Sequence, residues 1–307
     1  MSDATLATPP MRRFRVSRRA LPYLLSLPAL LACILILIPF ATAVGYSLQR
    51  YRLSQPWARE WNWGQNYVDL FNDPAFWNTL RVSLSYAFVV VGIELLLGLG
   101  IALLLQRRTR FNNFVSIMLL MPLMTAPALA ALMWKLMTNP GFGILSYFMA
   151  LIGFPDFRWA ASPNTAFLTV VLVDVWVYTP FIMILLLAGL RSLPQQPFEA
   201  AALDGVPRLF VFWRITLPML TPYLLTAVLF RMIESIQQFD IIYAMTQGGP
   251  GNRLTVFQVE AYLNFFQATN VGRSAAILMI LWVITYILST IFIKNWLRLR
   301  EKTRAGA

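Results

Sequence analysis

The sequence predicts an all-α membrane protein with six transmembrane helices and both termini in the cytoplasm. Of its 307 residues, 58% are hydrophobic and only 12% are charged. That charged fraction is about half of what a soluble domain carries. The apolar residues also occur in blocks of about 20, the length that a helix needs to cross a bilayer of about 30 Å.

Each apolar block is expected to be helical, because a single segment in lipid can satisfy its backbone polar groups only in a helix. In chain order the six predicted spans are Leu24–Gly45, Ser83–Leu105, Phe114–Leu136, Ala166–Leu187, Leu217–Ile236 and Ala275–Ile293. The first block is long and has no clear cleavage site, so we expect it to be retained as a span. A weaker apolar stretch, Ile144–Ile152, is too short to cross, which predicts a re-entrant or interfacial helix on the outer side.

The orientation follows from the basic residues. Most of the 25 Lys and Arg residues lie before the first span, in the second and fourth connections, and after the last span. Positively charged flanks stay in the cytoplasm. We therefore expect a basic cytoplasmic tail over residues 1–20, a membrane domain over 21–297 and a cytoplasmic tail over 298–307. Because it flanks the spans, the net charge of +12 indicates membrane orientation and no nucleic-acid partner.

The composition also excludes most catalytic chemistry. The chain has no histidine, and its one cysteine, Cys33, lies inside the first span. This removes histidine acid–base catalysis, Cys–His nucleophiles and the usual zinc ligand sets. There is no Gly-x-x-x-x-Gly-Lys-Ser/Thr phosphate loop to hydrolyse ATP. We expect no catalytic residue, no metal site and no cofactor on this chain, and thus no enzyme.

The fourth connection, Ser192–Pro218, has an unusual pattern for a cytoplasmic loop. Pro197 suits a first helical turn, the Glu199–Leu203 stretch favours a helix, and Gly205 suits its exit. The small alanine face would let another surface approach closely. Pro207 then opens a second segment that runs into the fifth span.

This connection resembles the EAA loop of ABC importer permeases. The resemblance rests on Glu199-Ala200-Ala201, Asp204-Gly205 and the terminal Ile215–Pro218 at matching spacing. It implies that the loop over residues 192–216 forms a coupling helix that sits in a cleft of a cytoplasmic ATPase. The coupling residues would be Glu199, Ala200, Ala201, Asp204 and Gly205.

A second segment narrows the resemblance. Met245–Asn252 contains Thr-Gln-Gly-Gly-Pro and is similar to the Thr-x-Gly-Gly-Pro loop of carbohydrate importers of the maltose/glycerol-phosphate permease family. Phe71–Trp77 and Trp134–Gly143 also fit that group. The chain has a short N-terminus and no inserted outer domain, unlike the best-known maltose permease, so maltose itself is not implied.

The resemblance implies the type I ABC importer permease fold and an assembly in the bacterial inner membrane. The partners would be a second homologous permease subunit, two cytoplasmic ATPases that hold ATP and Mg, a periplasmic solute-binding protein and membrane lipid. The assembly would import a sugar, polyol or sugar derivative by alternating access. The alternative is a subunit of a secondary transporter or channel that is not coupled to ATP.

Four ionisable residues lie inside predicted spans, where such residues usually face a cavity or a partner: Glu94, Asp174, Arg231 and Glu234. Arg231 and Glu234 are three residues apart and share a helix face. They either contact the solute or only pair with each other and hold helices together. Glu94 is expected to be mainly structural.

The resemblance also implies a solute site. Its residues are assigned by matching Trp176 and Pro180 in the fourth span, and by the spacing between the fifth span and Gly248–Pro250. Its contact residues would be Asp174, Val177, Tyr178, Phe181, Arg231, Glu234 and Ser235. Carboxylates and arginine can hydrogen-bond hydroxyl groups, and the aromatic rings offer faces to a sugar. If Arg231 faces the solute, it could also bind an anionic sugar derivative through two parallel hydrogen bonds.

Overall fold

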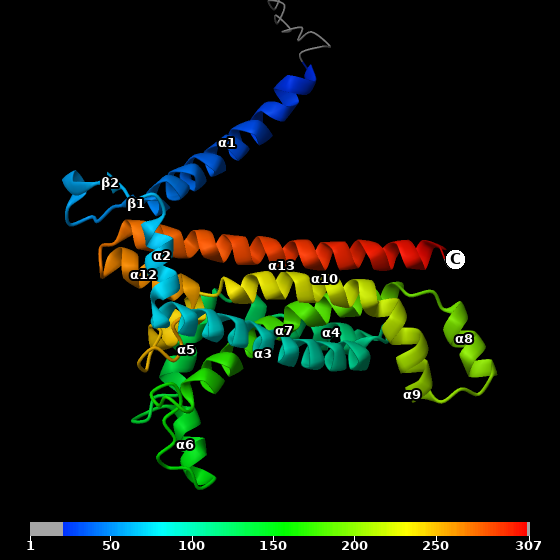
Figure 1. Cartoon of the computed structure of the whole chain (residues 1–307). Coiled ribbons are helices and arrows are strands. Elements are labelled where there is room, and N and C mark those ends of the chain that lie inside the picture. The colour runs from blue at the N-terminus through cyan, green and yellow to red at the C-terminus, as the bar shows by residue number, and fades with distance from the viewer. Residues whose placement is uncertain (1–20, 306–307) are drawn as a thin grey trace, which may run out of the picture. The chain divides into compact units, whose positions relative to one another are not determined.

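The computed structural model describes residues 21–305 (Figure 1). The predicted basic tail over residues 1–20 lies outside these residues. The chain divides into two units, residues 1–45 and residues 46–307, and each is described by itself. The first unit contributes most of α1 (Leu21–Ser47), an apolar helix that carries Pro28 and Pro39 in its interior.

The second unit is almost entirely helical. Its longer helices are α3 (Pro74–Leu105), α7 (Ala166–Ser192), α10 (Leu217–Ile236) and α13 (Val271–Ala305). Its shorter helices are α2 (Gln65–Asn72), α4 (Arg110–Leu119), α5 (Pro127–Met137), α6 (Ile144–Leu151), α8 (Gln196–Leu203), α9 (Arg208–Val211), α11 (Asp240–Thr246) and α12 (Phe257–Phe266). Short turns are η1 (Pro56–Ala58), η2 (Pro122–Met124) and the π-helical turn η3 (Phe212–Thr216), and a hairpin pairs β1 (Gln49–Arg50) with β2 (Glu60–Trp61) in antiparallel register.

Five predicted spans correspond to long helices. Within residues 21–305, five helices are long and apolar enough to cross a membrane: α1, α3, α7, the helix running through α9 and η3 into α10, and α13. The short stretch predicted over Ile144–Ile152 is α6. The helix α13 extends well beyond the predicted end of the last span at Ile293.

The prediction of one continuous helix over Phe114–Leu136 was wrong. The chain forms α4, then the single turn η2, then α5. Pro122 begins the turn and Pro127 begins α5. Proline has no backbone N–H and clashes with the preceding helical turn, so two prolines five residues apart interrupt the helix.

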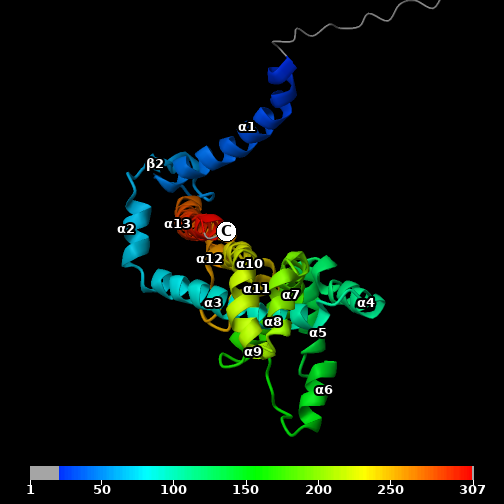
Figure 2. The ribbon, with the colours of Figure 1, turned by 90° about the vertical axis from the view of Figure 1, so that its right-hand side faces the viewer.

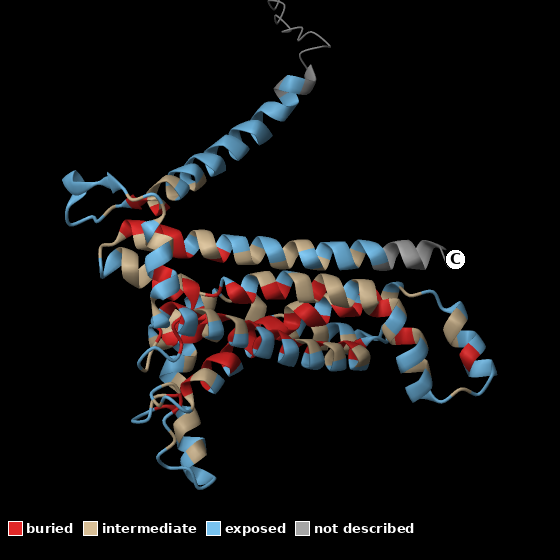
Figure 3. Ribbon diagram, viewed as in Figure 1, coloured by how far each residue is buried: buried red, intermediate tan, exposed pale blue. Residues whose placement is uncertain are grey.

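The core of the second unit lies along α7. This helix packs against α3 and α10, and α10 in turn packs against α13. Figure 2, which looks nearly along α13, shows α10 between α13 and α7. Buried residues gather along α7 and on the facing sides of α3 and α10, whereas much of α13 is exposed (Figure 3).

Close packing between these helices depends on small residues. A Cβ on Gly98 of α3 would lie 2.8 Å from the Cγ2 atom of Ile182 and 3.1 Å from the backbone nitrogen of Met183 on α7. A Cβ on Gly189 of α7 would lie 2.6 Å from the ring of Tyr223 on α10. Small residues at such crossings let helices approach closely in a membrane, where van der Waals packing drives helix association.

The two ends of the second unit differ. One end carries α2, α6 and α12, and we call it the α12 end; the other carries α8 and α9, and we call it the α8 end (Figure 1).

At the α12 end, Asp73 caps α3 by accepting a hydrogen bond of 2.9 Å from the Ala75 N–H. That hydrogen bond, together with the Arg273 guanidinium, holds the pKa of Asp73 below its usual value.

We predict that Gly98→Val lowers the stability of the folded chain, because the larger side chain overlaps Ile182 and the α7 backbone. Overpacking of this kind typically costs about 1–3 kcal/mol. The measurement is the thermal unfolding midpoint of the detergent-purified protein. Gly100→Val is the matched control, since a Cβ there has nothing within 4 Å; equal midpoints for the two variants would contradict the prediction.

Candidate functional site

A buried charge cluster joins the three central helices. Arg231 of α10 donates from Nε to Glu94 Oε2 at 2.7 Å and from Nη2 to Glu94 Oε1 at 2.8 Å. Its Nη2 atom also lies 3.1 Å from Asp174 Oδ1 on α7. The side chains of all three residues are fully buried. One guanidinium therefore bridges α3, α7 and α10.

Two further residues complete the coordination of Arg231. Its Nη1 atom donates to Glu234 Oε2 at 3.2 Å, and the Glu234 side chain is 45% exposed. The Tyr178 ring lies beneath the guanidinium, with 4.1 Å between the Arg231 Cζ atom and the ring centroid. Arginine over an aromatic face is attracted by the ring quadrupole, more strongly where water is excluded.

Tyr86 of α3 binds the carboxylate oxygen of Asp174 that Arg231 does not contact. Its hydroxyl donates to Asp174 Oδ2 at 2.6 Å, so both oxygens of that carboxylate have partners. A buried ion pair is stable only when its geometry is good and its remaining lone pairs are satisfied. The cluster meets that condition for Glu94 and Asp174, which explains how charged groups persist among the apolar side chains of three spans.

The predicted solute contacts lie in two different environments. Asp174, Val177, Tyr178, Arg231 and Ser235 are buried, and Val177 belongs to a hydrophobic cluster between helices. Phe181 is partly buried against a second such cluster. Glu234 is the one predicted contact with an exposed side chain. The structure thus brings Asp174, Tyr178, Arg231 and Glu234 together, but it places Val177 and Phe181 in helix packing.

Some buried polar atoms near this region have no hydrogen-bond partner among the described residues. They include Ser235 Oγ, next in sequence to Glu234, and Gln238 Nε2, both near the end of α10. Thr179 Oγ1 on α7 is a third. A buried polar group without a partner is destabilising by about 1–3 kcal/mol. Such atoms are suited to bind a group that this chain alone does not supply.

The sequence marks Glu94 as an intramembrane charge with a mainly structural role but does not identify its partner. Tyr86 carries no sequence signal that connects it with the cluster. Glu94 lies 137 positions from Arg231, and Tyr86 lies 88 from Asp174. An intramembrane carboxyl such as Glu94 indicates that a partner exists, since unpaired charges there are costly. The identity of that partner depends on which helices pack together.

The segment predicted as a coupling helix forms α8 as expected. Pro197 occupies its first turn and Glu199 is its acidic residue near the N-terminus. Glu199, Ala200, Asp204 and Gly205 are exposed, whereas Ala201 is 6% exposed. Gly205 has a φ of +64°, a left-handed conformation that ends the helix and favours glycine.

A nearly continuous helical path leads from this segment to the charge cluster. Pro207 caps α9, which passes through the π-helical turn into α10 without a break. Arg231 and Glu234 lie near the far end of α10. The exposed helix α8 at one end of the unit is therefore connected to the buried cluster by one bent helical segment and a short turn (Figure 1).

Comparison with known proteins identifies the family. Residues 94–302 match the family described as "Binding-protein-dependent transport system inner membrane component". The chain is 33% identical over 275 residues to a trehalose/maltose transport system permease protein of Thermococcus litoralis, covering 89% of this chain and 92% of that protein. It is 30% identical over 277 residues to a sulfoquinovosyl glycerol transport system permease protein of Agrobacterium fabrum, covering 90% of each chain.

A solved structure has the same fold. A chain of a bacterial ABC transporter involved in the import of the acidic polysaccharide alginate superimposes with a TM-score of 0.79 at 18% sequence identity. The match covers 92% of this chain and 96% of that chain. The chain therefore belongs to the family of binding-protein-dependent transport system inner membrane components, the permease subunits of ABC importers.

Proposed function

We propose that the chain imports a neutral, hydroxyl-rich solute such as a sugar or polyol, and that α8 couples this movement to ATP hydrolysis. It would act with a second homologous permease, two cytoplasmic ATPases and a periplasmic solute-binding protein in a bacterial inner membrane. In this proposal residues 21–297 form a six-span domain whose third span is the broken α4–α5 segment. Both tails, residues 1–20 and 298–307, are cytoplasmic.

The observation that carries the coupling role is the exposure of α8. The helix lies beyond the ends of α7 and α10 (Figure 1). Its acidic residue Glu199 and the following Asp204 are exposed. A short helix with exposed acidic and small residues, standing clear of the apolar helices, is suited to dock into another protein. The clustered basic residues around it favour the cytoplasm.

The helical path from α9 into α10 supplies a mechanism. When the ATPases close on ATP, α8 is displaced, and α9 transmits that displacement to α10. Because Arg231 joins α10 to α3 and α7, the three helices move as one group. Such rigid-body rocking exposes the solute site alternately to the two sides of the membrane. Hydrolysis returns the group to its starting position.

The arrangement around Arg231 favours a neutral solute. Four of the five N–H donors of a guanidinium are engaged by Glu94, Asp174 and Glu234, so little of Arg231 is left to bind an anion. Three carboxyl groups face this one cation, and an anionic sugar would be repelled by them. The exposed carboxylate of Glu234 and the unpartnered hydroxyl of Ser235 are instead suited to hydroxyl groups.

We predict that Gly205→Pro and Glu199→Lys abolish solute-stimulated ATP hydrolysis by the complete importer. Proline locks φ near −65°, which is incompatible with the φ of +64° at Gly205. The lysine reverses the exposed charge on α8. The assay uses the importer purified with its partner subunits in lipid, with and without the liganded binding protein.

Asp156→Lys is the control for this prediction, because Asp156 is an exposed acid outside α8. It should leave stimulation unchanged. Normal stimulation in both α8 variants would disprove the coupling role. Transport by the wild-type chain with no dependence on nucleotide would instead support a secondary transporter.

We predict that Glu234→Gln and Ser235→Ala weaken solute uptake while the chain stays folded. Loss of a hydrogen bond to a charged group corresponds to an increase of about tenfold or more in the KM for uptake in the Glu234 variant. Uptake into vesicles as a function of concentration measures this, and the thermal midpoint checks folding. An unchanged KM in both variants would place the solute elsewhere.

We predict that Arg231→Met destabilises the chain strongly, because it leaves Glu94 and Asp174 buried without a cation. Removal of one partner of a buried ion pair costs about 3–5 kcal/mol. Arg81→Met is the matched control, since Arg81 lies exposed on α3. The thermal midpoint should fall only in the Arg231 variant; equal midpoints would mean that the cluster does not hold the helices together.

A further inference from the structure

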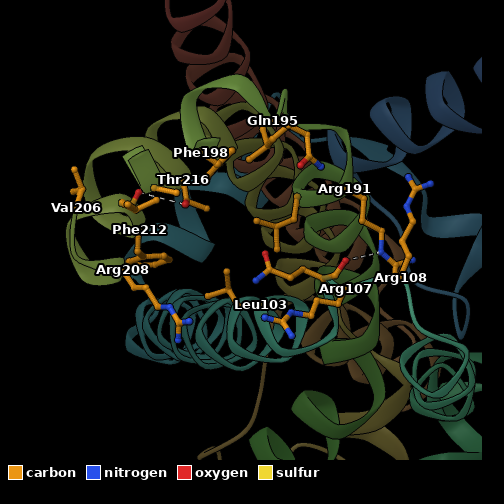
Figure 4. Close-up of a pocket in the computed structure, with 15 residues that line it drawn as sticks. Leu103, Arg107, Arg108, Arg191, Gln195, Phe198, Val206, Arg208, Phe212 and Thr216 are labelled. Atoms are coloured by element: carbon orange, nitrogen blue, oxygen red, sulfur yellow. Dashed lines mark hydrogen bonds between the residues drawn. The ribbon is translucent and has the colours of Figure 1, made fainter. Parts of the chain in front are cut away.

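A large cavity at the α8 end is not used by the function proposed above. Its volume is about 660 Å³, and it lies between the α8–α9 segment and the ends of α3 and α7. Figure 4 shows the side chains that line it. The coupling residues Glu199, Asp204 and Gly205 are not among them. The cavity is therefore on the side of α8 that faces the spans.

The cavity is strongly basic. The described residues that line it include four arginines and no aspartate or glutamate. The arginines are Arg107, Arg108, Arg191 and Arg208. In the view of Figure 4, Arg107 and Arg208 extend from opposite walls along the same side of the cavity, while Arg108 is directed away from its centre. This lining favours a ligand that carries negative charge.

The arginines are not equally available. Arg191 donates to the carbonyl oxygens of Leu105 and Gln106 at the end of α3, and to Asn113 Oδ1. It therefore closes a helix end and has a structural role. Within the described part of the chain, neither Arg107 nor Arg208 forms an ion pair within 4.0 Å. These two guanidiniums are free to bind an anion.

The remaining wall is partly apolar, since the polar residues Gln106, Gln195 and Thr216 also line it. Leu103, Leu190, Val211 and Phe212 line the cavity beside the arginines. The adjacent α9 and η3 expose large hydrophobic side chains, with Leu209 71%, Phe210 52% and Trp213 58% exposed. Arg107 lies two residues after Leu105, the last residue of α3. This combination of exposed aromatic residues and arginine at the end of a span is typical of the headgroup level of a membrane.

We propose that the cavity binds the phosphate group of an anionic phospholipid of the cytoplasmic leaflet, held by Arg107 and Arg208. The inference rests on the orientation in the proposed function, which puts the α8 end in the cytoplasm. Basic pockets at the cytoplasmic ends of transmembrane helices bind anionic headgroups. The apolar wall would receive the glycerol and upper acyl region, which a free phosphate ion does not have.

A lipid in this position would fill the space between the α8–α9 segment and the ends of the spans. It would contact α9 through Arg208 and the connection after α3 through Arg107, on either side of the cavity. When the ATPases displace α8, the bound lipid in the cavity would then help to transmit that displacement to α10. A phospholipid is favoured over an acidic protein segment because the cavity faces the spans and part of its wall, formed by Leu103, Leu190, Val211 and Phe212, is apolar.

The test measures lipid retained by the complete importer. The complex is purified from nanodiscs of phosphatidylcholine and phosphatidylglycerol, delipidated in mild detergent, and its bound lipid is counted by native mass spectrometry. The wild type is compared with the double variant Arg107→Gln, Arg208→Gln. We expect retention of phosphatidylglycerol to fall about 25-fold, since each arginine near an anionic surface contributes a factor of about five to binding.

Arg110→Gln is the matched control. Arg110 lies three residues after Arg107, as the first residue of α4, but does not line the cavity. It should retain phosphatidylglycerol like the wild type. Equal retention by the double variant and the wild type would overturn the proposal. The readout does not depend on transport, so it can fail or succeed independently of the proposed import function.

Two further arms separate other anions from a lipid. Millimolar inorganic phosphate is added to the complex in phosphatidylcholine alone, and its binding is measured by the same method. Binding of phosphate that the double variant loses, without retention of phosphatidylglycerol, would overturn the lipid assignment in favour of a soluble anion. Loss of the ATPase subunits from the double variant at unchanged lipid retention would show that the arginines contact an acidic protein surface instead.

Discussion

The buried ion cluster around Arg231 is the interaction on which the central part of the structure depends. Its guanidinium binds Glu94 of α3, Asp174 of α7 and Glu234 of α10 in one position. In an apolar environment each of these charges would be costly alone, so the three helices are held at the one packing that pairs them. The glycine contacts at Gly98 and Gly189 then determine how closely those helices approach.

This arrangement links two sites that lie far apart in the molecule. The exposed helix α8 continues through Pro207 and α9 into α10, and α10 carries Arg231 and Glu234 near its other end. The path from α8 to the cluster therefore runs through the successive helical elements α9, η3 and α10. The basic cavity lies beside the start of this path, where a bound lipid would bear on both α9 and α3.

The sequence predicted most of the architecture because bilayer thickness restricts what an apolar segment can do. Five spans and the short α6 and α8 helices follow from block length, proline and glycine placement. The prediction of the third span as one helix was wrong because the segment is apolar throughout, whereas its backbone is not helical throughout. Hydropathy responds to side-chain polarity, whereas the break at Pro122 and Pro127 arises from missing donors and steric clashes.

By itself the sequence determined the class of protein, its family resemblance and the short helix α8, because these depend on local composition and spacing. It also marked Glu94, Asp174, Arg231 and Glu234 as unusual, since charge within a span requires a partner. Only the tertiary structure decided that these four form one cluster and that Val177 and Phe181 pack between helices. Those facts depend on which helix faces meet across large separations in the chain, and a helix's own periodicity does not specify its neighbour.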